Sequence, residues 1–390
     1  MMRTSLILLA SAAPLACCAT NPVTGRSQLM LVSEDEEIQI DKQNAPYQFS
    51  ADYGTVQDKR LNDYIDRTGK NIAAQTHRTH MPYNFHVVNA IYVNAYAFPG
   101  GTIACTRGIL LSLDNEAELS ALLGHELGHV NARHTAEQMS KGMLTQTVVG
   151  GLAVAAGTQG AVYGNLASQL GQFGAGALLA SYSRDNEREA DALGMEYMVR
   201  AGYSAQGMVG LMDVLRSMGK HKPSAIELMF ATHPMSEERY QTAIEAIRTR
   251  YPDRAGKPIY RERYQDQTAS LRRMADAIEA MQNGETEMAR EKFTAAETQF
   301  QTALKKAPRD YTAHVLMAKC QYVQERFDRA AQYARDASQI YPQEAQAHLI
   351  MGVARIATGK FDDAFDNFDQ YDRMLPGNPN LIFLKGLARE

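Results

Sequence analysis

The C-terminal part of the chain carries an internal repeat of 34 residues, and this period constrains the fold more than any other feature. Three columns keep their register over three units: Phe293, Phe327 and Phe361; Ala296, Ala330 and Ala364; and Pro308, Pro342 and Pro376. A small residue lets two antiparallel helices approach closely, and a proline ends each unit. The period therefore predicts a stack of helical hairpins, whose core is continuous only when neighbouring units pack together.

The order of aromatic, small and proline positions within each unit resembles the tetratricopeptide pattern. We therefore expect an all-α tetratricopeptide repeat domain of three repeats over residues 265–390. Arrays of this kind present a concave surface that commonly binds peptides or partner proteins. The preceding residues 19–255 are numerous enough to form a separate domain with its own core.

Composition is typical of a globular protein and argues against one class of partner. Apolar residues make up 45% and charged residues 22% of the 390 residues, and the formal net charge is −4. These values are ordinary for a folded chain. Because lysine and arginine do not gather into a basic stripe, we expect no nucleic-acid partner.

The first 18 residues and the four cysteines bear on where the protein resides. Residues 1–18 contain a single charge and an apolar stretch too short to span a bilayer, so we interpret them as a signal peptide. A cysteine after this stretch is typical of a lipoprotein, with Cys17 or Cys18 as the lipid acceptor. A plain signal peptide with incidental cysteines is the alternative. Cys105 and Cys320 remain, and their spacing leaves open whether they pair.

The segment His125-Glu126-Leu127-Gly128-His129 points to metal chemistry. On a helix, His125 and His129 lie one turn apart on the same face, so both imidazoles can bind one metal ion. Neutral imidazoles suit Zn²⁺, which lowers the pKa of a water molecule to about 7. Glu126 is placed to accept a proton from that water as a general base. A helix with two ordinary histidines is the alternative, but the surrounding leucines predict a buried segment.

Two histidines and a water leave a tetrahedral zinc ion one ligand short. The metzincin pattern would place a third histidine at position 135, which is Thr135, and a glycine at position 132, which is Ala132. His134 lies about 140° around a continuous helix from His129, so we expect it to point away from the metal. The third ligand must therefore come from another segment.

A carboxylate from a separate helix is the remaining source of a ligand. Residues 187–191 offer Glu187, Glu189 and Asp191. Glu187 and Asp191 share a helix face, so one can bind zinc while the other hydrogen-bonds the outer nitrogen of a histidine ligand. A solvated face paired with Arg184 and Arg188 is the alternative. Spacing alone leaves the choice among the three carboxylates open.

The remaining patterns predict a mostly helical α+β domain with a small sheet. Residues 85–88, 91–98 and 102–107 are rich in aromatic and β-branched residues and are expected to be strands. A long helix is expected over residues 115–141, with Asp114 as its N-cap.

Two segments near the histidine motif have more than one interpretation. Residues 89–101 would form an edge strand that binds an extended peptide by strand addition, or else an inner strand. Residues 142–183 contain no Asp, Glu, Lys or Arg and many glycines. The sequence leaves three interpretations of residues 142–183 open: a packed helical hairpin, a flap over the site, or a segment that contacts lipid.

The chain as a whole resembles the gluzincin family that includes the HtpX-type and CAAX-prenyl-protease-type peptidases, in particular its periplasmic BepA-like members with tetratricopeptide repeats. The matching segments are residues 21–25, 94–95, 99–101, 118–119, 125–129, 187–191 and 232–234. The resemblance implies a zinc peptidase domain with one Zn²⁺ per chain, in which Glu187 is the third ligand beside His125 and His129. Asp191 would then support a histidine ligand, and Glu189 would be an ordinary helix residue.

The resemblance also implies that His233 lies near the zinc ion. There it would steady the oxyanion that develops on the substrate carbonyl, or bind zinc as a fourth ligand and hold the enzyme inactive. A histidine in a helix-capping loop is the alternative.

We therefore expect a zinc-dependent endopeptidase that hydrolyses peptide bonds in misfolded or stalled envelope proteins. The resemblance implies a role in outer-membrane protein quality control, with the repeats binding substrates or assembly partners. The expected location is the periplasm, anchored to the outer membrane if the chain is lipidated. The rival is a chaperone adaptor with a largely silent metal site. The presence of Glu126 argues against it, because zinc binding alone does not need that carboxylate.

Overall fold

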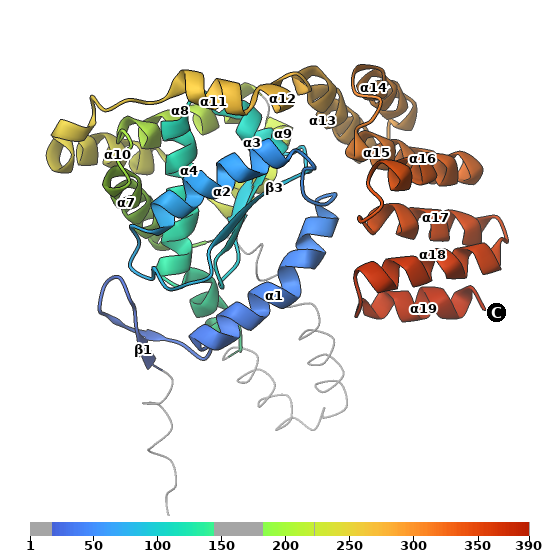
Figure 1. Ribbon diagram of the computed structural model, residues 1–390, viewed down its shortest axis with the longest axis horizontal. Coiled ribbons are helices and arrows are strands. Elements are labelled where there is room, and N and C mark those ends of the chain that lie inside the picture. The colour runs from blue at the N-terminus through green and yellow to red at the C-terminus, as the bar shows by residue number, and fades with distance from the viewer. Residues whose placement is uncertain (1–17, 144–181, 222, 390) are drawn as a thin grey trace, which may run out of the picture.

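The computed structural model describes residues 18–143, 182–221 and 223–389 (Figure 1). The predicted signal peptide and most of the glycine-rich segment 142–183 lie outside these residues. The described chain forms two lobes side by side: an N-terminal lobe of helices around a small sheet, and a repeat lobe of stacked helical hairpins. This arrangement confirms the predicted α+β, predominantly helical fold class.

A three-stranded sheet lies at the centre of the N-terminal lobe. Its strands are β3 (Asn84–Val88), β4 (Ala95–Ala97) and β5 (Thr102–Thr106), in the order β3-β5-β4. β5 is parallel to β3 and antiparallel to β4, so β4 forms an edge of the sheet. The strand predicted over residues 91–98 is shorter than expected. The hydroxyl of Thr106 bonds the backbone of Tyr92 and Asn94 and holds that stretch out of strand geometry.

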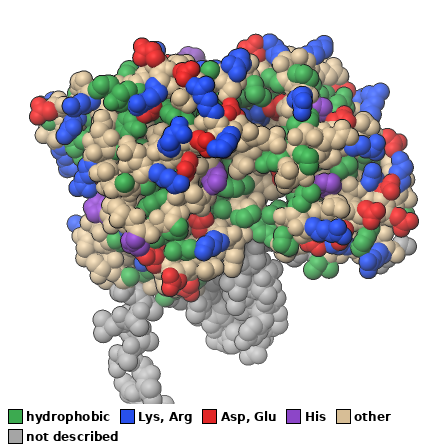
Figure 2. Space-filling view, in the orientation of Figure 1, with side chains coloured by type: hydrophobic (Ala, Val, Ile, Leu, Met, Phe, Trp, Pro, Cys, Tyr) green, Lys and Arg blue, Asp and Glu red, His purple; other side chains and the backbone are tan. Residues whose placement is uncertain are grey.

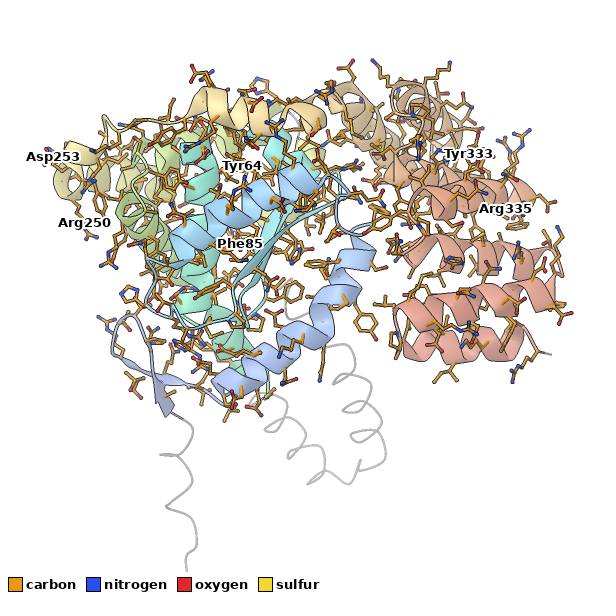
Figure 3. All side chains as sticks on the ribbon, viewed as in Figure 1. Tyr64, Phe85, Arg250, Asp253, Tyr333 and Arg335 are labelled. Carbon is orange, nitrogen blue, oxygen red and sulfur yellow. The ribbon has the colours of Figure 1, made fainter. Side chains whose placement is uncertain are left out.

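Helices surround the sheet and make up most of this lobe. In chain order they are α1 (Glu34–Ala51), α2 (Lys59–Ala73), α3 (Arg107–Ser112), α4 (Glu116–Asn131), α7 (Arg184–Arg200), α8 (Gln206–His221), α9 (Pro223–Thr232) and α10 (Glu237–Arg250), and a ribbon of β1 (Cys18–Thr20) and β2 (Ser27–Leu29) precedes them. α1 begins with a capping box between Ser33 and Glu36, which satisfies two backbone N–H groups. α2 covers β3, where the ring of Phe85 lies against Gly69 (Figure 3).

α4 is buried along its whole length and packs closely against α7. Glycines at the crossing allow the two backbones to approach. A Cβ on Gly128 would lie 2.8 Å from the carbonyl oxygen of Ala190, and one on Gly124 would lie 2.7 Å from that of Gly194. This close crossing brings the first turns of α7 beside the histidines of α4.

The prediction of one long helix over residues 115–141 is wrong, because α4 differs from it at both ends. The N-cap is Asn115 rather than Asp114, and α4 ends at Asn131. Arg133 adopts a left-handed backbone conformation, with φ of 60°, and helical structure resumes at residue 134. The guanidinium of Arg133 is held by the buried carboxylate of Glu37 in α1, a tertiary contact that no local sequence pattern reports.

The repeat lobe confirms the hairpins that the 34-residue period predicted. A connection of η1 (Pro252–Arg254), α11 (Arg261–Gln267) and α12 (Ala269–Arg272) leads to α13 (Ala275–Ala289), α14 (Phe293–Lys306), α15 (Tyr311–Val323), α16 (Phe327–Ile340), α17 (Gln346–Ala357), α18 (Phe361–Met374) and α19 (Pro379–Leu387). Each repeated phenylalanine is the first residue of the second helix of a hairpin. The repeated alanines, Ala296, Ala330 and Ala364, are fully buried where the helices approach.

Buried polar contacts join the two lobes. Arg107 of α3 forms an ion pair of 2.5 Å with Asp310, the N-cap of α15, and both side chains are almost fully buried. The carboxylate of Glu344 accepts hydrogen bonds from Ser50 at the end of α1 and from Tyr311 of α15. The repeat lobe is therefore held against the N-terminal lobe by specific contacts.

Three further features of the fold concern membrane-spanning helices, the cysteines and the surface charge. Among the described residues, no helix combines the length and apolar character that crossing a bilayer requires. Cys105 and Cys320 are both buried and free. On the face shown in Figure 2, acidic and basic side chains intermix over both lobes.

Candidate active site

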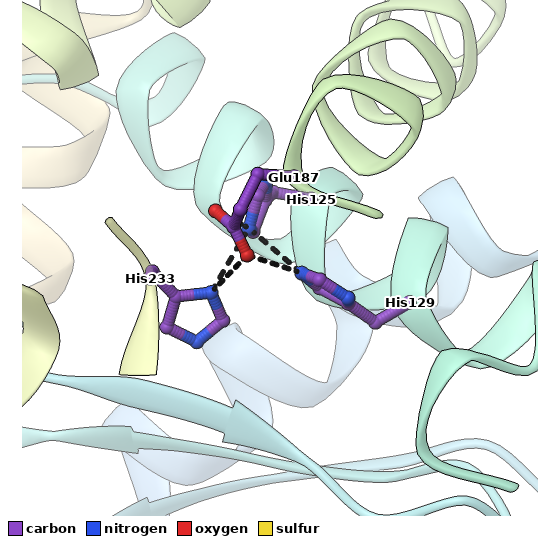
Figure 4. Close-up of side chains that lie close together, drawn as sticks. All are labelled: His125, His129, Glu187 and His233. Atoms are coloured by element: carbon purple, nitrogen blue, oxygen red, sulfur yellow. Dashed lines mark hydrogen bonds and ion pairs between the residues drawn. The ribbon is translucent and has the colours of Figure 1, made fainter. Parts of the chain in front are cut away.

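Three separate elements bring four side chains together beside the edge strand β4 (Figure 4). α4 supplies His125 and His129, one turn apart on the same face. Glu187 comes from the first turn of α7, and His233 from the loop that follows α9. All four side chains are buried, and they are distant from one another in the sequence except for the α4 pair.

The donor atoms of these side chains form a compact group. The Nε2 atoms of His125 and His129 lie 3.1 Å apart, and that of His129 lies 3.3 Å from Glu187 Oε1. His233 Nδ1 lies 3.1 Å from the same oxygen and 3.3 Å from His125 Nε2. Four tetrahedral ligands with bonds of about 2.0–2.1 Å to zinc lie about 3.3–3.4 Å from one another. The donor set therefore fits an ion of that size.

A charged network fixes the outer side of His125. Its Nδ1 lies 3.0 Å from Asp191 Oδ1, one turn beyond Glu187 on α7. Arg239 of α10 donates to both oxygens of Asp191, at 2.6 and 2.8 Å. The carboxylate therefore accepts the Nδ1 proton of His125 and leaves Nε2 free to face the other donors.

The outer side of His129 has a partner that the sequence did not predict. His134 Nδ1 lies 2.9 Å from His129 Nδ1, and His134 Nε2 lies 3.3 Å from Glu189 Oε2. His134 lies outside the donor group, but the continuous helix assumed for it is wrong, because the chain turns at Arg133 and brings His134 against the outer edge of His129. Glu189 likewise is more than an ordinary helix residue, since it contacts His134.

Burial and charge set the protonation of the site. Burial holds the pKa of His129 well below its ordinary value, which favours the neutral form that binds metals. Burial also raises the pKa of Glu187, but the imidazoles of His125, His129 and His233 outweigh it, so that this carboxyl stays ionised. The pKa of Glu126 is raised by burial more than the facing His233 lowers it.

Comparisons with known proteins agree with this geometry. The model of peptidase family M48 matches residues 59–247, and a tetratricopeptide repeat model matches residues 281–345. The chain is 33% identical to the metalloprotease YcaL of Escherichia coli K12, over 52% of this chain and 73% of that protein. The chain belongs to peptidase family M48.

Two other relatives match a similar share of the chain. The metalloprotease LoiP of Escherichia coli K12 is 34% identical, over 47% of this chain and 68% of that protein. The beta-barrel assembly-enhancing protease of Yersinia pestis is 30% identical over 50% of this chain, but the match spans only 41% of that longer protein.

The described residues leave little open space beside the four side chains. Tyr182 stacks on His129 with ring centroids 3.8 Å apart, and its backbone N–H donates to the carbonyl of Thr232. The cavity left between β4 and His233 measures about 10 Å³, about the least space that one water molecule needs. Tyr182 was missed in the sequence, because it lies near the end of the uncharged segment 142–183 without any distinguishing pattern.

Two buried polar groups face this cavity without a hydrogen-bond partner among the described residues. One is Glu126 Oε1, and the other is the side-chain amide of Asn94, whose oxygen and nitrogen are both unpaired. Buried polar atoms are seldom left unpaired unless a ligand or water completes them. Asn94 had appeared only as part of the family resemblance, since a single asparagine beside a strand carries no signal of its own.

Proposed function

We propose that the protein is a zinc-dependent endopeptidase that holds one Zn²⁺ through His125, His129 and Glu187. The observation that carries the proposal is the set of donor separations, which matches those of a tetrahedral zinc site. Beside it lies Glu126, whose Oε1 has no hydrogen-bond partner among the described residues. Membership of family M48 supports it. Zinc, when bound, polarises the substrate carbonyl and lowers the pKa of a water molecule.

Other residues of the chain would transfer the proton, orient a metal ligand and bind the peptide backbone. Glu126 accepts a proton from the attacking water and delivers it to the leaving amine, a role suited to a carboxyl whose pKa is raised by burial. Asp191 orients His125. The amide of Asn94 offers a donor and an acceptor to the backbone of a peptide laid along β4.

His233 has two roles in this proposal, one in each state of the enzyme. In the structure its Nδ1 takes the fourth corner of the donor set, where it would exclude water from the ion. This position supports a closed resting state, in which His233 must withdraw before catalysis. After withdrawal it would remain beside Glu126, from which its Nε2 now lies 3.8 Å away, and would donate to the developing oxyanion.

The substrates we propose are misfolded or misassembled envelope proteins. Relatives named beta-barrel assembly-enhancing protease support a role near the outer-membrane assembly machinery. An edge strand reads mainly the peptide backbone, so β4 suits unfolded chains of varied sequence. The repeat lobe would bind substrates or assembly partners, and the protein would act in the periplasm as a lipoprotein of the outer membrane.

The test compares wild type with Glu126→Gln in cleavage of unfolded casein, with zinc content measured on both. We expect full zinc in both proteins and cleavage by the wild type alone, because removing a general base costs about 10²–10⁴ in rate. Glu196→Gln, two turns beyond Glu189 on α7 and paired with Arg200, serves as the control and should cleave normally. Equal cleavage by wild type and Glu126→Gln would assign the activity to another site. No cleavage by zinc-loaded wild type would favour the chaperone adaptor.

A further inference from the structure

A turn after α4 returns the chain to the site that α4 has just left. On an unbroken helix, residue 134 would lie about 140° around the axis from residue 129. In the structure α4 stops at Asn131, and the left-handed conformation of Arg133 redirects the next helical segment. His134 therefore meets the outer edge of His129, with their Nδ1 atoms 2.9 Å apart.

Other elements hold this turn in place. A left-handed conformation at a residue other than glycine costs about 1–3 kcal/mol, so it persists only where the surroundings enforce it. Arg133 donates to Glu37 of α1 at 3.0 Å and to the carbonyl of Val32 at 2.7 Å. Glu37 is fully buried and also pairs with Arg78. The position of His134 is thus built into the packing of α1 against the end of α4.

The geometry assigns the protons along this chain of contacts. His129 Nε2 faces the donor set, so the proton of the neutral imidazole belongs on Nδ1. That N–H donates to His134 Nδ1, which then carries its own proton on Nε2. The Nε2 atom that carries this proton lies 3.3 Å from Glu189 Oε2. His125 receives the same support directly from the carboxylate of Asp191.

We propose that His134 is a positioning residue for metal binding: it accepts the Nδ1 proton of His129 and so orients Nε2 toward the ion, and Glu189 fixes the tautomer of His134. The inference rests on the proposed zinc site and adds a second supporting network, on the opposite side from Asp191. A histidine that merely filled space would need neither the direct contact between the two Nδ1 atoms nor the facing carboxylate.

The test measures the zinc dissociation constant of the full chain by competition with a chelator, together with the melting temperature of the metal-free protein. His134→Leu removes the acceptor, and we expect zinc affinity to fall by about 10–100-fold. His134→Asn places an amide oxygen where Nδ1 stood, and it should recover most of that loss. Both variants should melt close to wild type without metal.

Glu189→Ala provides a second variant that does not depend on filling the buried position. It should weaken zinc binding, whereas Glu196→Ala, on the same helix with similar exposure, should not. Equal affinities of wild type, His134→Leu and Glu189→Ala would overturn the inference. So would an equal loss in the leucine and asparagine variants, which would mean that the acceptor is irrelevant. If wild type itself binds no zinc, the proposed function fails along with the inference.

Discussion

The close crossing of α4 and α7 makes Gly128→Ala a sharp probe of the site. The new Cβ would lie 2.8 Å from the carbonyl oxygen of Ala190 and 2.9 Å from its Cα, whereas ordinary contact begins at 3.4 Å. Both neighbours are backbone atoms, which cannot swing aside as the end of a side chain can. The two helices must therefore separate by about 0.6 Å at this point, the difference between 3.4 and 2.8 Å.

That separation has an energetic and a geometric consequence. Overpacking costs about 1–3 kcal/mol, and the better helix propensity of alanine offsets about 1 kcal/mol of it. The net loss of up to about 2 kcal/mol lowers the melting temperature by about 2–4 °C per kcal/mol for a domain of this size. Glu187 lies less than one turn from Ala190 on α7 and moves with it. Since a functional site tolerates displacements of about 0.5 Å, zinc affinity should fall as well.

The assay pairs the zinc dissociation constant with thermal unfolding of the metal-free protein. Gly386→Ala is the matched control, because this residue also lies in a helix but a Cβ there meets nothing within 4 Å. The control should be as stable as wild type or slightly more stable, with unchanged zinc affinity. If Gly128→Ala binds zinc as tightly as wild type, the argument that the glycine contact sets the position of Glu187 is refuted.

Two further predictions concern buried charges outside the site. Arg107→Ala removes the cation that pairs with the buried carboxylate of Asp310, and it should lower the free energy of unfolding by about 3–5 kcal/mol in urea titrations. Lys306→Ala breaks an exposed ion pair and should lower the free energy of unfolding by no more than about 1 kcal/mol. Equal effects of the two substitutions would refute the role of burial. Burial raises the pKa of Asp52 above its ordinary 3.8, so the folded state keeps this proton to higher pH than the unfolded state and loses stability as pH rises through the folded pKa. Relative to Asp52→Asn, wild type should therefore lose stability as the pH rises above the ordinary Asp value of 3.8. Parallel stability curves for the two proteins would contradict this.

The predictions from the sequence succeeded where a pattern depends on local geometry alone. His125 and His129 face the same way because helical periodicity places every fourth residue on one face. The columns of phenylalanine and alanine predicted the hairpins because each unit repeats the same short-range packing. Local signals failed at the end of α4, since the turn at Arg133 depends on Glu37, which is 96 positions away.

The sequence by itself therefore determined that two histidines share one face of α4, that a carboxylate follows the first of them, and that the repeats form stacked helical hairpins. Spacing along the chain left open which carboxylate of residues 187–191 joins the histidine donors, whereas the family resemblance implied Glu187. The crossing of α7 over α4 places Glu187 there. The tertiary structure also decided that Glu189 meets His134, that His233 Nδ1 lies beside His125 Nε2 and that the lobes join through Arg107. These outcomes depend on distances between segments remote in the chain, and no spacing along one helix encodes such distances.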